Sequence, residues 1–249
     1  MTKFKQFLVS IQNLLVIKYV TFRLNNFLNK KNFTRLGTYY GGWWISNQIL
    51  ENARLVGGTC ISCGIGNDVS FDEAMLRNNF KIIALDPLKD SCNYANVQLS
   101  IYKNKEILNL GIWTRSGGIS FNAPKIKEHN SWSITNSHKG NIEEKVSFQC
   151  ITLKELIKLS RIDSSMPNLI LKMDIEGAEL ELLNDIASLE VKFDMLCIEL
   201  DCLSLIPFLN FKSRFRNSVK VRKEIHKLKS SGYQLVLVEN FNFFWTRKI

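Results

Sequence analysis

Short apolar runs alternate with segments of helical periodicity along most of the chain, and this alternation restricts the fold more than any other feature. The apolar runs have the length of buried strands, and they lie at residues 55–62, 81–85, 106–113, 146–151, 168–173 and 193–200. Helical patterns lie between or after them, at residues 68–79, 91–99, 152–159, 175–189 and 219–230. This order predicts an α/β protein with a mostly parallel sheet that helices cover on both faces. Residues 233–238 and 241–245 predict a closing antiparallel hairpin.

The first 36 residues differ from the rest of the chain. Apolar side chains recur at helical spacing over residues 4–15, with Lys and Gln between them. We therefore predict a basic amphipathic helical extension over residues 1–36 and one domain over residues 37–249. The helix either packs on the domain or lies on a membrane surface. No run reaches the ~18 uninterrupted apolar residues of a membrane span, and no small-residue cleavage motif follows residues 7–20, which argues against a secretory signal.

The net charge of +10 is concentrated in two segments. Residues 1–36 hold seven basic residues and no acid, and residues 212–229 hold eight basic residues and one acid, Glu224. Each segment contributes +7, which leaves −4 for the remainder of the chain. This distribution favours a local anionic contact, such as a membrane surface touched by residues 1–36, over a protein that coats nucleic acid.

The six cysteines do not form a zinc or disulfide pattern. Cys60 and Cys63 make one C-x-x-C with no second pair, and the three histidines are not at zinc-finger spacing. Most of the cysteines lie in or beside apolar runs, where Cys acts as a small buried hydrophobe. We predict reduced, structural cysteines and therefore a reducing compartment, the cytoplasm. A redox-active C-x-x-C is the alternative.

The first site candidate is a glycine loop at the end of the first main strand. Gly64 and Gly66 permit a tight turn and close approach of a ligand, and Asp86 ends the next strand, 22 residues after Gly64. The pattern suits either a nicotinamide dinucleotide or S-adenosylmethionine. Val69 stands where a dinucleotide loop has its third glycine, and the acids Asp68 and Asp72 at the helix start disfavour phosphate, so S-adenosylmethionine is favoured. A turn without a ligand is the structural alternative.

The ends of two later strands carry acids. Asp174 and Glu176 follow residues 168–173, and Glu199 and Asp201 end the run at residues 193–200. Charges at the end of a buried strand are costly unless they are paired or functional. Asp174 is either functional or a helix cap, and Lys172, on the same face of the strand, is a candidate partner for it.

Some polar residues have two further candidate roles, as ligands of a metal ion or as a general base. Asp174, Glu199 and Asp201 offer oxygen ligands for a divalent cation. Strand-end carboxylates bind hydroxyls or water more often, so we expect no metal. His129 and His138 lie in the polar stretch at residues 114–148, where each is either a general base or an exposed side chain.

These segments resemble the FkbM-type S-adenosylmethionine-dependent methyltransferases. Four segments follow the family's order: Gly41-Gly42-Trp43, the glycine loop at residues 62–72, Leu85-Asp86-Pro87, and residues 171–179, which read LKMDIEGAE and are the most specific match. The resemblance covers about residues 37–245. It departs from the family at Asn67, where an acid is common, and at Glu199-Leu200-Asp201, where the family often has Glu-Phe-His.

The resemblance implies a Rossmann-like class I methyltransferase fold and methyl transfer to oxygen, with a sugar hydroxyl of a glycan or glycoconjugate as the acceptor. Carried over by motif, the residues that would bind S-adenosylmethionine are Gly64, Ile65, Gly66, Asp68, Phe71, Asp72, Asp86 and Pro87, with Trp113 near the adenine by analogy of position. Asp174 and Glu176 would line the methyl-transfer crevice. Our first candidate for the base or acceptor-binding group is Asp174, followed by Glu199, Asp201 and His129.

Three other functions remain as alternatives. An inactive S-adenosylmethionine-binding scaffold in a glycan-assembly complex would keep the same glycine loop and Asp86. A nicotinamide oxidoreductase lacks support because the third glycine is missing. A nucleic-acid methyltransferase is favoured only by the charge, since Asp174-Ile-Glu-Gly stands where Asp/Asn-Pro-Pro-Tyr/Phe is expected.

Overall fold

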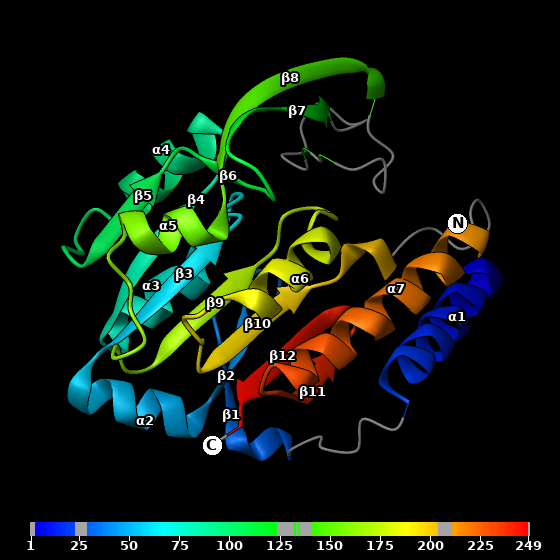
Figure 1. Ribbon diagram of the computed structural model, residues 1–249, viewed down its shortest axis with the longest axis horizontal. Coiled ribbons are helices and arrows are strands. Elements are labelled where there is room, and N and C mark those ends of the chain that lie inside the picture. Colours follow the sequence, from blue (N-terminus) through cyan, green and yellow to red (C-terminus); the bar gives the residue numbers. More distant parts are fainter. Residues whose placement is uncertain are drawn as a thin grey trace.

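The computed structural model describes residues 3–22, 29–123, 132, 134, 141–203 and 211–248. Its centre is a seven-stranded sheet (Figure 1) in the order β11 (Tyr233–Glu239), β12 (Asn242–Arg247), β10 (Met195–Glu199), β9 (Leu169–Met173), β3 (Gly58–Cys63), β4 (Phe80–Leu85) and β5 (Lys105–Leu108). Strands β10, β9, β3, β4 and β5 are parallel to one another, and β12 is antiparallel to both of its neighbours. The predicted α/β fold with a mostly parallel sheet and a closing hairpin is confirmed.

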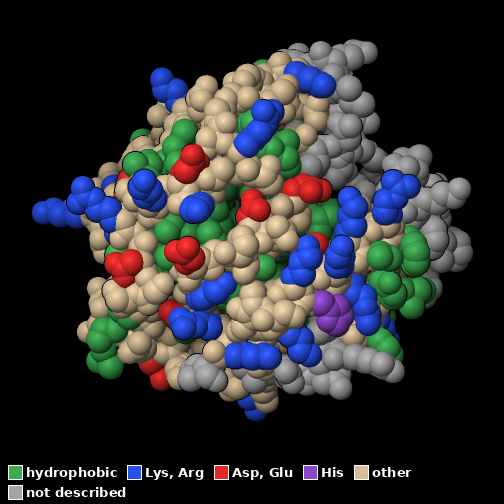
Figure 2. Space-filling view, in the orientation of Figure 1, with side chains coloured by type: hydrophobic (Ala, Val, Ile, Leu, Met, Phe, Trp, Pro, Cys, Tyr) green, Lys and Arg blue, Asp and Glu red, His purple; other side chains and the backbone are tan. Residues whose placement is uncertain are grey.

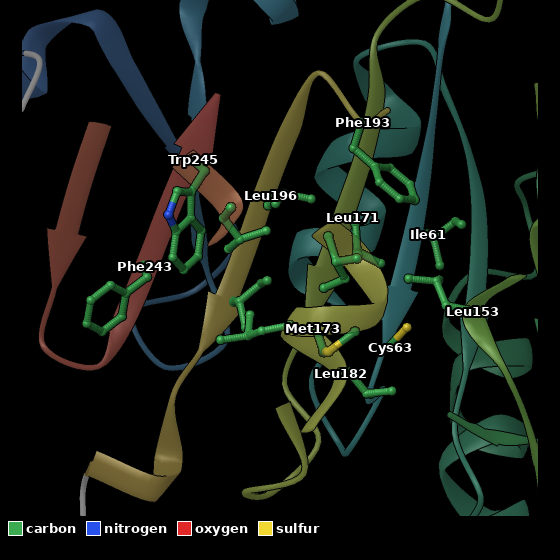
Figure 3. Close-up of a cluster of buried hydrophobic side chains, with 14 of the residues drawn as sticks. Ile61, Cys63, Leu153, Leu171, Met173, Leu182, Phe193, Leu196, Phe243 and Trp245 are labelled. Carbon is green, nitrogen blue, oxygen red and sulfur yellow. The ribbon is translucent and has the colours of Figure 1, made fainter. Parts of the chain in front are cut away.

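Side chains of the strands alternate between two hydrophobic layers, one on each face of the sheet. On one face, Ile61 and Leu171 belong to a core that includes residues of α5 (Leu153–Leu159), α6 (Glu179–Ser188) and α7 (Phe211–Ser230), part of which Figure 3 shows. On the other face, Cys60 and Ile170 pack with residues of α2 (Asn47–Val56), α3 (Ser70–Arg77) and α4 (Lys89–Gln98). Because both faces are covered, the parallel strands are apolar almost throughout.

Several predicted elements agree closely with the structure. Strand β9 is fully buried along all five residues, as its uninterrupted apolar run predicts. Helix α5 begins at the expected N-cap, where the Thr152 hydroxyl accepts from the Glu155 N–H at 3.2 Å and the Glu155 carboxylate accepts from the Thr152 N–H at 3.2 Å. This capping box satisfies N–H groups that the first turn leaves free. All six cysteines are buried and form no disulfide.

The prediction of one strand over residues 106–113 is wrong. Strand β5 ends at Leu108, and β6 (Gly111–Ile112) leaves the main sheet and pairs with β8 (Asn141–Ile151), which also pairs with β7 (Gly117–Ala123). Strand β7 and the first part of β8 lie in the stretch that we expected to be loop. Ile119 and Phe121 are buried while Ser120 is exposed, an alternation that the surrounding polar residues obscure.

The N-terminal part also holds elements that the pattern did not predict. A hairpin of β1 (Phe33–Leu36) and β2 (Trp43–Ser46) precedes α2, so part of residues 1–36 pairs with the domain. Helix α1 (Lys3–Thr21) packs against α7, where the Arg222 guanidinium donates to the Tyr19 carbonyl at 2.6 Å and Val20 is buried. Among the described residues, no helix is both long and apolar enough to cross a membrane.

Candidate active site

A cavity of about 500 Å³ lies at the carboxyl end of the sheet, beside the ends of β3, β4 and β9. The chain runs from β3 outward to β4 and β5 on one side, and β9 and β10 fill the other side. Ligands of open α/β sheets bind at this kind of reversal in strand order. The lining includes eight of the predicted site residues: Gly64, Ile65, Gly66, Asp68, Asp86, Pro87, Asp174 and Glu176.

The glycine loop is shaped by close contact on one side and open space on the other. Gly64 has φ +84°, and a Cβ at this position would lie 1.7 Å from the Asp174 carbonyl oxygen. Gly66 has φ +58°, and a Cβ there would meet no atom within 4 Å. Glycine at 64 is therefore required by the neighbouring strand end, whereas glycine at 66 leaves room beside the cavity.

Asp86 fixes this loop. One carboxylate oxygen accepts from the N–H groups of Ile65 at 2.9 Å and Gly66 at 3.1 Å, and the other accepts from the Leu88 N–H at 2.8 Å. Burial raises the pKa of Asp86, and these backbone hydrogen bonds oppose that shift. The predicted contact with a ribose stays a prediction, but the carboxylate also has a structural task that the sequence did not indicate.

Asp68 links the loop to the turn before β2. Its carboxylate accepts from the Ser70 N–H at 2.8 Å and from the Thr38 hydroxyl at 2.5 Å. Burial acts to raise the pKa of Asp68, but the hydrogen bonds from Ser70, Thr38 and Gly41 together lower it. Asp68 therefore presents an ionised carboxylate to the cavity.

Lys172 is a cavity residue that sequence reasoning noted only as a partner of Asp174. It is 6% exposed, and its Nζ donates to the Gly64 carbonyl at 2.5 Å and lies 3.8 Å from Asp174 Oδ2. The strand position next to the glycine loop could have indicated this contact, because a buried lysine needs an acceptor. Lys172 thus ties the end of β9 to the loop after β3.

The acids at the ends of β9 and β10 divide into two layers. Asp174 and Glu176 line the cavity, while Glu199 and Asp201 do not and lie behind Asp174. Burial, followed by repulsion from Asp174 and Asp201, raises the pKa of Glu199 to about 10, so this side chain is protonated at neutral pH. The direct role predicted for Glu199 and Asp201 at the substrate is therefore not supported by their position.

Aromatic side chains form much of the remaining wall: Tyr40, Trp43, Phe121 and Trp132. They come from the turn before β2, β2 itself, β7 and the segment between β7 and β8. Sequence reasoning missed all four, although two aromatic residues in a polar stretch, Phe121 and Trp132, were a usable signal. Burial, then repulsion by Asp174 and Glu176, raises the pKa of Tyr40.

Three predicted cofactor-binding residues lie in the described part of the chain but do not line the cavity. Phe71 and Asp72 are buried in α3 and do not line the cavity. Trp113 packs on the small sheet beside Phe121 rather than against the cavity. His129 lies outside the described residues. Direct contact of Phe71, Asp72 or Trp113 with a bound cofactor is not supported by these positions.

The donor set fits S-adenosylmethionine better than a dinucleotide. Among the described lining residues, the acids are Asp68, Asp86, Asp174 and Glu176, and the basic side chain is Lys172, which already donates to Gly64. Carboxylates suit an ammonium group, a sulfonium and ribose hydroxyls, whereas a pyrophosphate needs free cations or N–H groups. The open space at Gly66 supplies room for such a ligand beside the loop.

Comparison with known structures returns proteins of low identity. They include an rRNA methylase from Streptococcus thermophilus (11% identity, 81% of this chain and 93% of that chain, TM-score 0.42). Another is a ribosomal protein L11 methylase from Lactobacillus delbrueckii subsp. bulgaricus (12% identity, 81% of this chain and 76% of that chain, TM-score 0.39). A third is a fibrillarin pre-rRNA processing protein from Methanococcus jannaschii (8% identity, 89% of this chain and 85% of that chain, TM-score 0.41). These TM-scores are below 0.5, so these structures are not used to assign the chain to a family.

The family comparison is specific. No curated protein matches the chain significantly. The profile described as the methyltransferase FkbM domain matches residues 46–202, which is more than half of the chain and spans α2 to the end of β10. That range contains the glycine loop, Asp86 and Asp174. The chain therefore belongs to the FkbM methyltransferase family, and S-adenosylmethionine is its methyl donor.

Proposed function

We propose that this methyltransferase transfers the methyl group to a hydroxyl oxygen of a sugar in a glycan or glycoconjugate. The observation that carries the proposal is the position of Asp174, whose carboxylate lies on the cavity wall next to the glycine loop. A carboxylate there can accept a hydrogen bond from an acceptor hydroxyl. The aromatic residues of the cavity wall offer flat apolar surface for the C–H faces of a sugar ring, and such mixed lining is typical of small-molecule sites.

One part of the cavity would hold the methyl donor, and another part would hold the acceptor. S-Adenosylmethionine supplies an electrophilic methyl group when it is bound. The loop held by Asp86, together with Asp68, would hold the donor, and Asp174 and Glu176 would orient the acceptor hydroxyl. Methyl transfer needs an in-line approach of the oxygen, so positioning supplies much of the acceleration. Asp174 would also accept the hydroxyl proton as general base.

Methylation assays with radiolabelled S-adenosylmethionine and a panel of glycans and nucleotide sugars would test this function. We expect label in an O-methyl sugar, identified by mass spectrometry after hydrolysis. Asp174→Asn should lower the rate by on the order of 100-fold or more, because it removes the base, while cofactor affinity changes little. Glu181→Gln, the same charge change at an exposed position of α6, is the matched control.

Two outcomes would contradict the proposal. Cofactor binding without transfer to any sugar would favour the alternative of a scaffold in a glycan-assembly complex. Full activity of Asp174→Asn would remove this residue from the reaction and leave Glu176 as the carboxylate at the acceptor.

A further inference from the structure

Three carboxylates from different segments converge behind the cavity wall. We call Asp174, Glu179 and Asp201 the acidic cluster; a carboxylate oxygen of each lies within 4.8 Å of those of the other two. They come from the end of β9, the first turn of α6 and the segment after β10. Oxygens bound to one divalent cation lie up to about 5 Å apart, twice a metal–oxygen distance of about 2.0–2.6 Å. The cluster therefore has the dimensions of a cation site.

The surroundings of Glu179 are a second, independent reason to expect a cation at the acidic cluster. It is 0% exposed, and its Oε1 accepts from the N–H groups of Ile175 at 2.8 Å and Gly177 at 3.2 Å. Its Oε2 is buried, and no described residue makes a hydrogen bond to it. A buried carboxylate oxygen without a partner is costly, and a bound cation is one of the few groups that removes the cost.

Lys172 is a described basic side chain that lies beside the acidic cluster. Lys172 Nζ lies 3.8 Å from Asp174 Oδ2, but its shorter contact, 2.5 Å, is with the Gly64 carbonyl. Glu199 adds a further acid beside Asp174. Carboxyl groups from four residues thus lie close together, and that of Glu179 is fully buried.

We propose that the acidic cluster binds one divalent cation of the Mg²⁺ or Mn²⁺ type through Asp174, Glu179 and Asp201. Hard divalent cations prefer carboxylate oxygens, and Glu199 would support the site from outside as a hydrogen-bonding neighbour of Asp174. Asp174 also lines the cavity, so a cation bound behind it would hold its carboxylate in place toward the acceptor. This catalytic role rests on the proposed function, whereas cation binding does not.

Calorimetric titration of the chelator-treated full chain with MnCl₂ or MgCl₂ alone would test the site. We expect one cation per chain, a Mn²⁺ spectrum in electron paramagnetic resonance that changes on binding, and a higher melting temperature. Glu179→Gln and Asp201→Asn should each weaken Mn²⁺ binding at least tenfold, because each removes a charged ligand. Glu181→Gln, in the same helix and exposed, should bind as the wild type does.

The outcomes separate this proposal from the proposed function. Absence of cation binding in the wild type, or unchanged binding in both Glu179→Gln and Asp201→Asn, would overturn the site. If Glu179→Gln does not fold, Mn²⁺ binding by Asp201→Asn and the Mn²⁺ spectrum of the wild type still show whether the site exists. Full methyl transfer in excess chelator would remove the cation from catalysis and leave the methyltransferase function intact.

A second observation concerns the outer surface of α1 and α7. Ile11, Leu15 and Tyr19 follow one another along one side of α1 at a spacing of four residues, and Phe22 comes directly after the helix. Leu15 is 59% exposed, and the Tyr19 ring lies 6.0 Å from the ring of Phe215 in α7, which is 56% exposed. The two helices therefore share one exposed apolar surface, which we call the α1–α7 patch.

Basic side chains accompany this patch. Arg216, Lys220, Lys223 and Lys229 are exposed on α7, whose single acid, Glu224, pairs with Lys227 at 2.9 Å. Figure 2 shows hydrophobic side chains next to a group of Lys and Arg side chains on the side of the molecule where α1 and α7 lie. The basic segment at residues 212–229 thus lies beside the exposed apolar side chains of α1. Apolar side chains flanked by cations are complementary to anionic lipid.

We infer that the α1–α7 patch binds an anionic membrane surface. Sedimentation of the full chain with phosphatidylcholine vesicles, with and without phosphatidylserine, tests this directly. We expect binding that needs phosphatidylserine and weakens with salt. Lys220→Glu with Lys223→Glu should weaken it at least about tenfold, and Leu15→Ser should also weaken it. Lys89→Glu, on the exposed side of α4, is the control.

Three results would overturn the membrane site: no binding to either vesicle, equal binding to both, or wild-type binding by the double variant. Size-exclusion chromatography tests whether a second copy of the chain, instead of a membrane, binds to the α1–α7 patch. A dimer that Leu15→Ser converts to a monomer would assign the α1–α7 patch to a second copy of the chain instead.

Discussion

Replacing Asp86 with alanine would remove a side chain that joins the glycine loop to the end of β4. The carboxylate accepts from three backbone N–H groups, those of Ile65, Gly66 and Leu88, at 2.8–3.1 Å. The first two N–H groups belong to the loop that forms the cavity wall. Loss of the carboxylate therefore frees the loop at the position where the cofactor binds.

The expected magnitude follows from these contacts. A hydrogen bond to a charged acceptor contributes about 1.5–3 kcal/mol, and water can replace part of this where the N–H groups reach the cavity. We expect the free energy of unfolding of Asp86→Ala to fall by about 2 kcal/mol. We also expect the dissociation constant of S-adenosylmethionine to rise at least tenfold, which corresponds to about 1.4 kcal/mol or more.

Urea unfolding and calorimetric titration measure the two effects separately. Asp90→Ala is the matched control, because it makes the same charge change at an exposed position of α4. Its cofactor affinity should equal that of the wild type. An unchanged affinity in Asp86→Ala would refute the assignment of Asp86 to the cofactor site, and an unchanged free energy of unfolding would refute its role in the loop.

Three further changes test the local account. Gly64→Ala should lower the free energy of unfolding in urea by about 3 kcal/mol or more, because its Cβ would lie 1.7 Å from the Asp174 carbonyl oxygen. Gly66→Ala should lower it by only about 1–2 kcal/mol, because the positive φ is the only cost there. Equal losses in the two variants would contradict this contrast. Thr152→Ala should lower the free energy of unfolding by about 1 kcal/mol through loss of the capping box with Glu155, and no change would argue against the cap. The six buried thiols should resist Ellman's reagent at mildly alkaline pH until the chain unfolds, since burial raises their pKa values; rapid labelling of the folded chain would contradict their burial.

The main sheet could be predicted because its signals are local. Strand β9 is buried on both faces and so appears as an unbroken apolar run, and the glycine loop is marked by residues next to each other in the chain. Helix α2 was missed although Ile49, Leu50 and Ala53 follow a helical spacing, since its neighbouring residues are mostly polar. Strands β7 and β8 stabilise one another across a long intervening segment, and such pairing leaves little trace in a local window.

The same distinction applies to the site. Asp86 and Asp174 were identified because strand ends of a parallel sheet meet at one edge. The wall formed by Trp43 and Trp132 depends on how the β1–β2 hairpin and the small sheet pack over that edge, which no spacing in the sequence encodes. No spacing indicates that Glu179 is buried, yet it is fully buried because the turn after β9 folds its side chain back onto the N–H groups of residues 175 and 177.

Calorimetric titration of the wild-type chain with S-adenosylmethionine, and separately with NADH, tests the central claim most directly. The acid-lined cavity at the end of β3 should bind S-adenosylmethionine with a micromolar dissociation constant and one molecule per chain, and NADH should not bind. Binding of NADH in preference, or of neither compound, would contradict the assignment of this cavity to the methyl donor.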